Sequence, residues 1–156
     1  MTSRKERSIT SLIDIEDEDL NRGDWKWCDT IPGVDDSFYG IPCYANYVHW
    51  FNPTGNLTKT IGPDLGNSSY KWSQGVMADS GVIYCIPYNY DKVMKIDTNV
   101  RENNNNGNVT IIDAKLPEEG NAKWMSGATS KIGGCIYCMP HNAKKILKIN
   151  PKDDSF

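Results

Sequence analysis

Apolar residues from position 25 onward fall into short runs that are separated by turn-forming residues. Between residues 74 and 113, four such runs alternate with segments rich in Asp, Ser, Gly and Asn. Runs of this length and spacing predict strands at residues 74–78, 82–87, 92–97 and 109–113. No run has the 3.6-residue period of an amphipathic helix, so the pattern predicts an all-β fold.

The four-strand pattern starts three times along the chain. A Lys-Trp pair opens each copy at residues 26–27, 71–72 and 123–124, and a Pro follows the Trp after 15, 15 and 16 residues. The pairs lie 45 and 52 residues apart, and the seven extra residues sit in the Asn-rich segment 101–107. Four strands in about 45 residues are typical of one β-propeller blade.

These repeats divide the chain into a tail and about three blades. Residues 1–24 form a charged N-terminal tail. Residues 8–15 echo the run at 109–113, so they are either a lone outer strand of a preceding blade or part of a solvated tail. The blades are expected at residues 25–70, 71–122 and 123–156. Propellers typically close with about four to eight blades, so three blades predict an incomplete ring.

Short motifs in the repeats resemble those of known propeller proteins. Gly-Val at 75–76, Gly-x-Ile-Tyr at 81–84 and Lys-x-x-Lys-Ile-Asp at 92–97 are similar to landmarks of the NHL-like, streptogramin-lyase-like and kelch-like families. The double glycine of kelch repeats is missing. The resemblance covers residues 25–156 and implies propeller blades, and it is unspecific for function.

An incomplete ring leaves open blade faces at both ends, and open sheet edges invite aggregation. We expect the chain to be a fragment of a longer propeller. The alternative is that two chains close a six-bladed ring as a homodimer, with each N-terminal strand completing the open blade of the partner.

The net charge of the chain is confined to its N-terminus. The total is −3, and residues 1–24 carry four basic and seven acidic side chains, which also sum to −3. Residues 25–156 are therefore neutral and lack the basic excess of a nucleic-acid interface. No apolar run is long enough for a membrane helix, and no apolar segment follows the first basic residues as in a signal peptide. We predict no nucleic-acid partner, no membrane partner and a cytoplasmic location.

Five cysteines are present, and two of them have the spacing of a metal or redox motif. Cys135 and Cys138 form a Cys-x-x-Cys pair within an expected strand. Residues three apart on a strand point to opposite faces, so both thiols cannot bind one metal ion. We predict small core residues here, with no metal site and no cofactor. An odd number of cysteines without a signal peptide also argues against disulfides.

The best candidates for a binding site lie at one face of the blades. In related propellers, the loop before the first strand of a blade and the loop between its second and third strands share this face. Here these loops carry aromatic and basic side chains suited to stacking and to acidic partners. The candidate ligand-binding residues are Lys26, Trp27, Lys71, Trp72, Tyr88, Lys123, Trp124 and His141. The alternative, favoured for the tryptophans, is packing between blades, because positions repeated in every copy usually serve the fold.

No catalytic set is apparent among these residues. Streptogramin-lyase-like enzymes depend on a His with acidic and metal-binding partners, whereas His49 and His141 occupy unlike positions in the repeat. We therefore carry no catalytic residue over. The sequence favours a non-enzymatic binding or scaffold module that recognises a protein partner through a propeller face. The alternatives are a fragment of a propeller enzyme, a lyase or hydrolase, and a carbohydrate-binding propeller.

Overall fold

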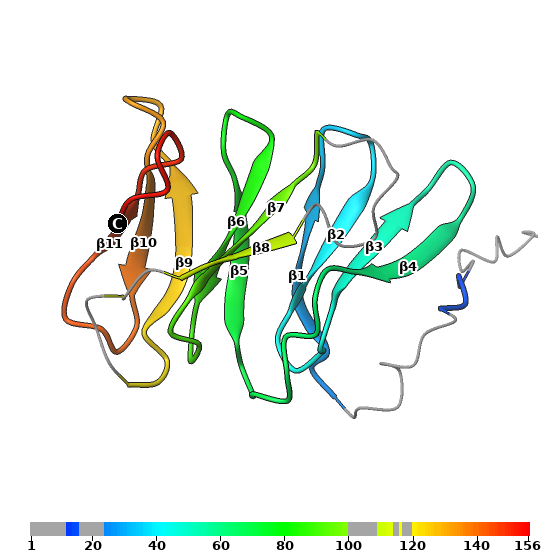
Figure 1. The fold of residues 1–156 in the computed structure, drawn as a ribbon, viewed down its shortest axis with the longest axis horizontal. Coiled ribbons are helices and arrows are strands. Elements are labelled where there is room, and N and C mark those ends of the chain that lie inside the picture. The colour runs from blue at the N-terminus through cyan, green and yellow to red at the C-terminus, as the bar shows by residue number, and fades with distance from the viewer. Residues whose placement is uncertain (1–11, 16–23, 100–108, 114–115, 117–119) are drawn as a thin grey trace, which may run out of the picture.

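The computed structural model describes residues 12–15, 24–99, 109–113, 116 and 120–156 (Figure 1). Within these ranges, eleven strands form three antiparallel sheets. The same ranges contain no helix with the length and hydropathy needed to span a membrane. The all-β prediction is confirmed.

Each sheet is one repeat of the sequence, with its strands in chain order. The first sheet contains β1 (Trp27–Pro32), β2 (Phe38–Pro42), β3 (Val48–Asn52) and β4 (Leu57–Ile61). The second contains β5 (Trp72–Met77), β6 (Val82–Pro87), β7 (Val93–Asp97) and β8 (Val109–Ile112). The third contains β9 (Trp124–Thr129), β10 (Ile136–Pro140) and β11 (Leu147–Ile149). The strands predicted for the second copy agree with these bounds to within two residues.

The sheets also share one register. In each sheet the repeated Trp pairs with the repeated Pro, giving Trp27–Pro42, Trp72–Pro87 and Trp124–Pro140. The register then shifts by one residue directly after the Trp in all three copies. A bulge of this kind re-aims the side chains around it. Because it recurs, the bulge belongs to the blade and not to a specialised site.

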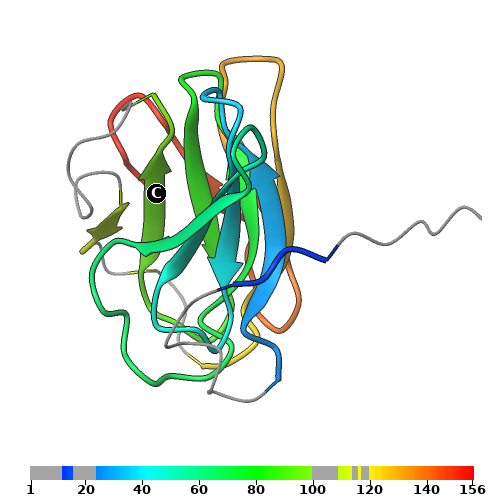
Figure 2. The ribbon, with the colours of Figure 1, turned by 90° about the vertical axis from the view of Figure 1, so that its right-hand side faces the viewer.

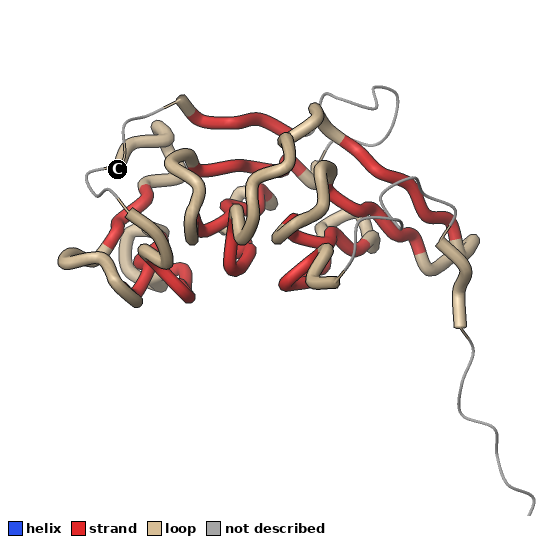
Figure 3. The backbone as a smooth tube through the Cα atoms, turned by 90° about the horizontal axis from the view of Figure 1, so that it is seen from below, coloured by secondary structure: helices blue, strands red, loops and turns tan. Residues whose placement is uncertain are grey.

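The three sheets stand side by side in an arc (Figure 1). The first strands β1, β5 and β9 are neighbours at the inner edge of this arc, and the later strands of each repeat fan outward (Figure 3). Sheets arranged in this way around a common axis are the blades of a β-propeller. The structure therefore confirms propeller blades in an incomplete ring.

The hydrophobic core lies between the blades, in two clusters. One cluster joins the first and second blades and includes Tyr39, Ile41, Trp50, Trp72, Ile83, Met94 and Ile96. The other joins the second and third blades and includes Val76, Tyr84, Ile86, Trp124, Ile136 and Leu147. Each blade therefore depends on its neighbour for the burial of its apolar face.

The third sheet has three strands within the described residues, and a fourth begins at its edge. Asn150 bridges Ser155, and Asn52 pairs with Leu57 in the first blade at the same separation along the chain. The carboxylate of Asp154, in the turn between them, accepts hydrogen bonds from Tyr84 and Lys95 of the second blade. These contacts hold the end of the chain against the neighbouring sheet.

Of the N-terminal tail, the structure describes residues 12–15 and 24. Residues 12–15 run in front of the first blade (Figure 2) and pair with no strand. Residues 8–11 lie outside the described ranges, so the outer strand expected over residues 8–15 stays a prediction.

Candidate functional site

The repeated Trp side chain connects the first and third strands of each blade. The indole N–H of Trp27, Trp72 and Trp124 donates to the backbone carbonyl of Tyr47, Lys92 and Lys145 at 3.1, 3.0 and 2.8 Å, respectively. Trp72 and Trp124 are fully buried, whereas Trp27 is half-buried at the open face of the first blade. A buried indole needs such an acceptor, so the same bond recurs in every copy.

The repeated Lys side chain connects each blade to the one before it. The ammonium group of Lys71 donates to the carbonyl oxygens of Tyr44, Gly66 and Ser68 at 3.3, 3.2 and 2.9 Å. That of Lys123 donates to the carbonyl oxygens of Asn89 and Gly120 at 3.2 and 3.1 Å. Burial lowers the pKa of Lys123. A buried charge is costly unless it is hydrogen-bonded, and these carbonyls supply the bonds.

Four of the eight candidate ligand-binding residues therefore lie inside the fold. Lys71, Trp72, Lys123 and Trp124 are at most 2% exposed, and their polar atoms bind the backbone. These side chains present almost no surface to a ligand, because they are buried and their polar atoms form hydrogen bonds to the backbone within and between blades. For Trp72 and Trp124 this is the packing between blades that the sequence offered as the alternative. A binding role stays a prediction for the more exposed Lys26, Trp27, Tyr88 and His141.

Tyr88 and His141 belong to a row of aromatic rings that crosses all three blades. The row consists of Tyr44, Tyr70, Tyr88 and His141, and we call it the aromatic row. Neighbouring ring centroids are 4.7, 6.1 and 5.9 Å apart in that order. The loops that carry these residues lie at the lower end of the sheets in Figure 1. The structure thus places aromatic side chains on the face where the sequence predicted them.

Hydrogen bonds hold the loops of the aromatic row in place. The side chain of Asn89 accepts from the backbone N–H of Ala122 at 2.8 Å and donates to the carbonyl of Ser69 at 3.1 Å. The backbone N–H of His141 donates to the carbonyl of Lys123 at 2.8 Å. Loops held in this way lose little conformational freedom when a partner binds.

The residue before each Lys-Trp pair has a left-handed backbone. The φ angle is +60° at Trp25, +52° at Tyr70 and +52° at Ala122. Residues other than glycine rarely adopt this backbone conformation, so its recurrence indicates a turn that is part of the blade structure. Trp25 is 67% exposed and Tyr70 is 37% exposed. Neither residue is among the predicted candidates, although an aromatic residue directly before two of the three Lys-Trp pairs was an available signal in the sequence.

Two tyrosines of the row also interact through their hydroxyl groups. A hydrogen bond with Tyr70 is the main cause that raises the pKa of Tyr44 to about 12. A tyrosine keeps its proton at neutral pH, and this shift extends the pH range over which the Tyr44 phenol does so. A neutral phenol can both donate and accept a hydrogen bond, which suits recognition of backbone groups.

The Cys-x-x-Cys pair is divided between the core and a strand end. Cys138 is buried in β10, where burial raises the pKa of its thiol to about 12. Cys135 is half-buried directly before β10. A thiol that keeps its proton is a poor nucleophile and a poor metal ligand. Among the described residues, no group of three or more His, Cys, Asp or Glu side chains is placed to hold a metal ion.

Solved structures share this architecture, whereas the sequence matches no family model and no curated protein. The chain is similar to virginiamycin B lyase from Staphylococcus aureus, with a TM-score of 0.62 and 10% identity over 80% of the chain. It is similar to a streptogramin B lyase, with a TM-score of 0.61 and 15% identity over 83% of the chain. The extracellular domain of a protein described as a one-component system from B. thetaiotaomicron has a TM-score of 0.56 and 17% identity over 81% of the chain.

The chain covers a minority of each of these proteins. It spans 38% and 39% of the two lyase chains and 17% of the third chain. At these identities the likeness shows the fold alone, because propellers with unrelated functions share one architecture.

Proposed function

We propose that the chain is a non-enzymatic binding module that recognises a protein partner through the aromatic row. The observation that carries this proposal is the continuous contact of four aromatic rings across three blades. Tyrosine is enriched at protein interfaces because it offers a large, rigid contact area together with a hydroxyl group. A row that crosses several blades can follow an extended segment of a partner.

The shape of the aromatic row favours a protein over a sugar. Successive ring planes meet at 67°, 51° and 51°, so the four rings share no common plane. They form a ridge of tilted rings, and not one flat platform of the kind on which a pyranose stacks. A peptide can instead pack its side chains along both flanks of such a ridge.

The burial of two lysine ammonium groups near the aromatic row also changes the chemistry expected of the partner. Lys71 and Lys123 were predicted to attract acidic groups, but both ammonium ions are buried against backbone carbonyls. The row itself offers phenol, imidazole and ring carbon atoms. We therefore expect the partner segment to be apolar with hydrogen-bonding groups, and not strongly acidic.

The proposal is tested with a phage-displayed library of random peptides as the probe. Tyr70→Ala and Tyr88→Ala remove rings of the row without opening the core, and we expect each to weaken binding of selected peptides about tenfold or more. Leu57→Ala is the matched control, since Leu57 is 60% exposed in β4 and outside the row. We expect it to leave binding unchanged.

Two outcomes would contradict the proposal. Peptides that bind the Tyr70→Ala variant as tightly as the original chain would place recognition elsewhere. A glycan array tests the carbohydrate alternative in parallel. Glycan binding that Tyr70→Ala abolishes, without any selected peptide, would assign the aromatic row to carbohydrate.

A further inference from the structure

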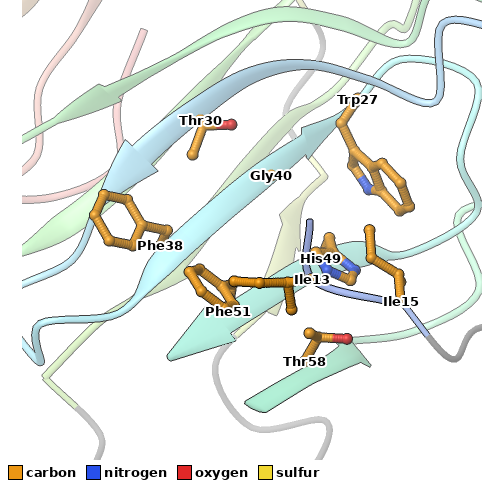
Figure 4. Close-up of a pocket in the computed structure, with 9 residues that line it drawn as sticks. All are labelled: Ile13, Ile15, Trp27, Thr30, Phe38, Gly40, His49, Phe51 and Thr58. Atoms are coloured by element: carbon orange, nitrogen blue, oxygen red, sulfur yellow. The ribbon is translucent and has the colours of Figure 1, made fainter. Parts of the chain in front are cut away.

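The first blade has an apolar hollow on the face that looks away from the second blade. Its volume is about 410 Å³, and Trp27, Phe38, Gly40 and Phe51 of the sheet are among the residues that line it. Ile13 and Ile15 of the N-terminal segment point into it from the other side (Figure 4).

This hollow is the counterpart of a surface that is buried elsewhere in the chain. A shift of 45 residues superimposes the first copy of the repeat on the second. The lining residues Phe38, His49 and Phe51 then align with Ile83, Met94 and Ile96, which form the core between the first and second blades. The hollow is therefore one half of a blade–blade interface.

The third blade carries the other half of such an interface. Tyr84, Ile86 and Val93 of the second blade pack toward the third in the core. Their counterparts in the third blade are Tyr137, Met139 and Ile146, which are 38%, 47% and 56% exposed. Adjacent exposed apolar side chains of this size mark a contact surface.

One contact between an Ile and a Gly is shared by the two internal interfaces, and it can be compared with the open faces. At both internal interfaces an Ile side chain lies over a Gly. A Cβ atom at Gly75 would be 2.9 Å from Ile41, and one at Gly127 would be 2.8 Å from Ile86.

At the open ends this pair of residues is changed on both sides. Met139 takes the place of the Ile, and Thr30 takes the place of the Gly. The small residue lies instead on the next strand, because Gly40 pairs with Thr30. The space for the side chain therefore lies at Gly40 and not at Thr30. The unbranched side chain of Met139 can adopt a conformation that reaches this space more easily than a β-branched Ile could.

The N-terminal segment matches the outer strand of a blade in its spacing along the chain. Residues 12–15 end 12 residues before Trp27, and β8 ends 12 residues before Trp124. Ile112 of β8 packs against the core between the second and third blades, and Ile13 and Ile15 contact the first blade in the same way. Residues 12–15 thus occupy the place of the outer strand of a preceding blade.

We propose that the two ends of the chain bind each other between two copies. The third blade of one copy docks on the first-blade face of the other, and residues 12–15 of the second copy add to the edge of β11, next to the bridge of Ser155 to Asn150. Head-to-tail contacts form either closed rings or open filaments. Two copies of the chain supply six blades, within the roughly four to eight of closed propellers. In the proposed closed dimer, a second copy occupies each open face.

The mass of the full chain in solution tests the dimer. Light scattering on a sizing column, repeated over a range of concentrations, should give twice the mass of one chain and then a plateau. A monomer at every concentration would overturn the proposal and point to further blades of a longer chain. A mass that rises without a plateau would overturn closure at two copies.

Two charge variants test which surfaces meet. Met139→Glu alters the third-blade face, and Phe38→Glu alters the first-blade face. Each variant alone should remain a monomer, because every contact requires one face of each kind. When the two variants are mixed, one intact pair of faces remains and a heterodimer should form. Association of either variant by itself would mean that like faces meet, and would overturn the proposal.

Control variants separate docking from folding. Ile132→Glu is the matched control, since Ile132 is 89% exposed in the turn between β9 and β10, and it should leave the dimer intact. Thermal unfolding checks that each variant is folded. If Phe38→Glu fails this check, Thr58→Glu replaces it, because Thr58 lines the same hollow.

Proline variants test the added strand. Successive N–H groups of a strand point to opposite sides, so either Ile13→Pro or Asp14→Pro must remove a hydrogen bond to β11. We expect one of the two to weaken the dimer at least tenfold, with Ile13→Ala as the control for the lost side chain. If neither does so, residues 12–15 do not pair with β11, and that part of the proposal is overturned.

Discussion

Lys71 and Lys123 place an ammonium group where two blades meet. Each donates to carbonyl oxygens of the loop that enters its own blade and of a loop in the preceding one. An aliphatic stem of four carbons lets the charge cross this distance while the stem itself packs in the core. Each Lys is therefore expected to stabilise the junction between two blades.

Replacement of Lys71 should destabilise the whole chain. Lys71→Met keeps the apolar stem but leaves the carbonyl oxygens of Tyr44, Gly66 and Ser68 without this donor. Hydrogen bonds to charged groups contribute about 1.5–3 kcal/mol, so we expect the free energy of unfolding to fall by about 3 kcal/mol in urea titrations. Lys148→Met is the control, since Lys148 is exposed on β11, and it should change little. Equal effects of the two variants would contradict the structural role of Lys71.

Neighbouring blades are joined by hydrogen bonds between their first strands. The side chain of Asp29 accepts from the backbone N–H of Gly75 at 3.1 Å, and that of Gln74 accepts from the N–H of Gly127 at 3.0 Å. The first strands thus form the same side chain to backbone bond at both junctions. Apolar side chains pack so closely against Gly75 and Gly127 that a Cβ atom at either position would clash with them.

Gly127→Ala should therefore loosen the junction of the second and third blades. The added Cβ atom would lie 2.8 Å from Ile86 and 2.9 Å from the carbonyl oxygen of Tyr137. The carbonyl cannot shift without disturbing strand pairing, so we expect a loss of about 1–3 kcal/mol in unfolding free energy.

The control for this substitution is Gly55→Ala in the turn between β3 and β4. Its new Cβ atom would meet only the side chain of Leu57, at 3.2 Å, and Leu57 is exposed and free to move. Its unfolding free energy should stay close to that of the original chain. A loss as large as that of Gly127→Ala would show that the blade junction is not the cause.

At the scale of the whole molecule, two buried tyrosines link stability to pH. Burial raises the pKa of Tyr39, with a further contribution from Asp35, and burial together with Asp154 raises that of Tyr84. The folded chain therefore keeps these protons after the unfolded chain has lost them. This stabilisation is fully present below the ordinary tyrosine pKa of 10 and is lost as the pH rises above it.

We expect the unfolding free energy to fall as the pH is raised from neutrality to above 10. The double variant Tyr39→Phe and Tyr84→Phe should show a flatter dependence, because the two linked groups are gone. Urea unfolding of both proteins at several pH values is the measurement. Parallel curves for the two proteins would contradict a role for these tyrosines.

The repeat, the strand positions and the three blades can all be predicted from the sequence. The spacing of Trp, Pro and turn residues reports on local backbone geometry, which neighbouring residues in the chain control. It also placed Tyr88 and His141 on one face, because equivalent loops of repeated blades must lie together.

Which of these residues meet solvent depends on how the blades pack against one another. Lys71 and Trp72 are basic and aromatic residues of the kind found in binding sites. They are nevertheless buried, because the blade that begins 45 residues earlier covers them. Tyr70 has a left-handed backbone and is 37% exposed, although it directly precedes the buried Lys71. Burial depends on contacts between blades, and such contacts join residues far apart in the chain, so the hollow of the first blade and the aromatic row emerged only once the blades were packed.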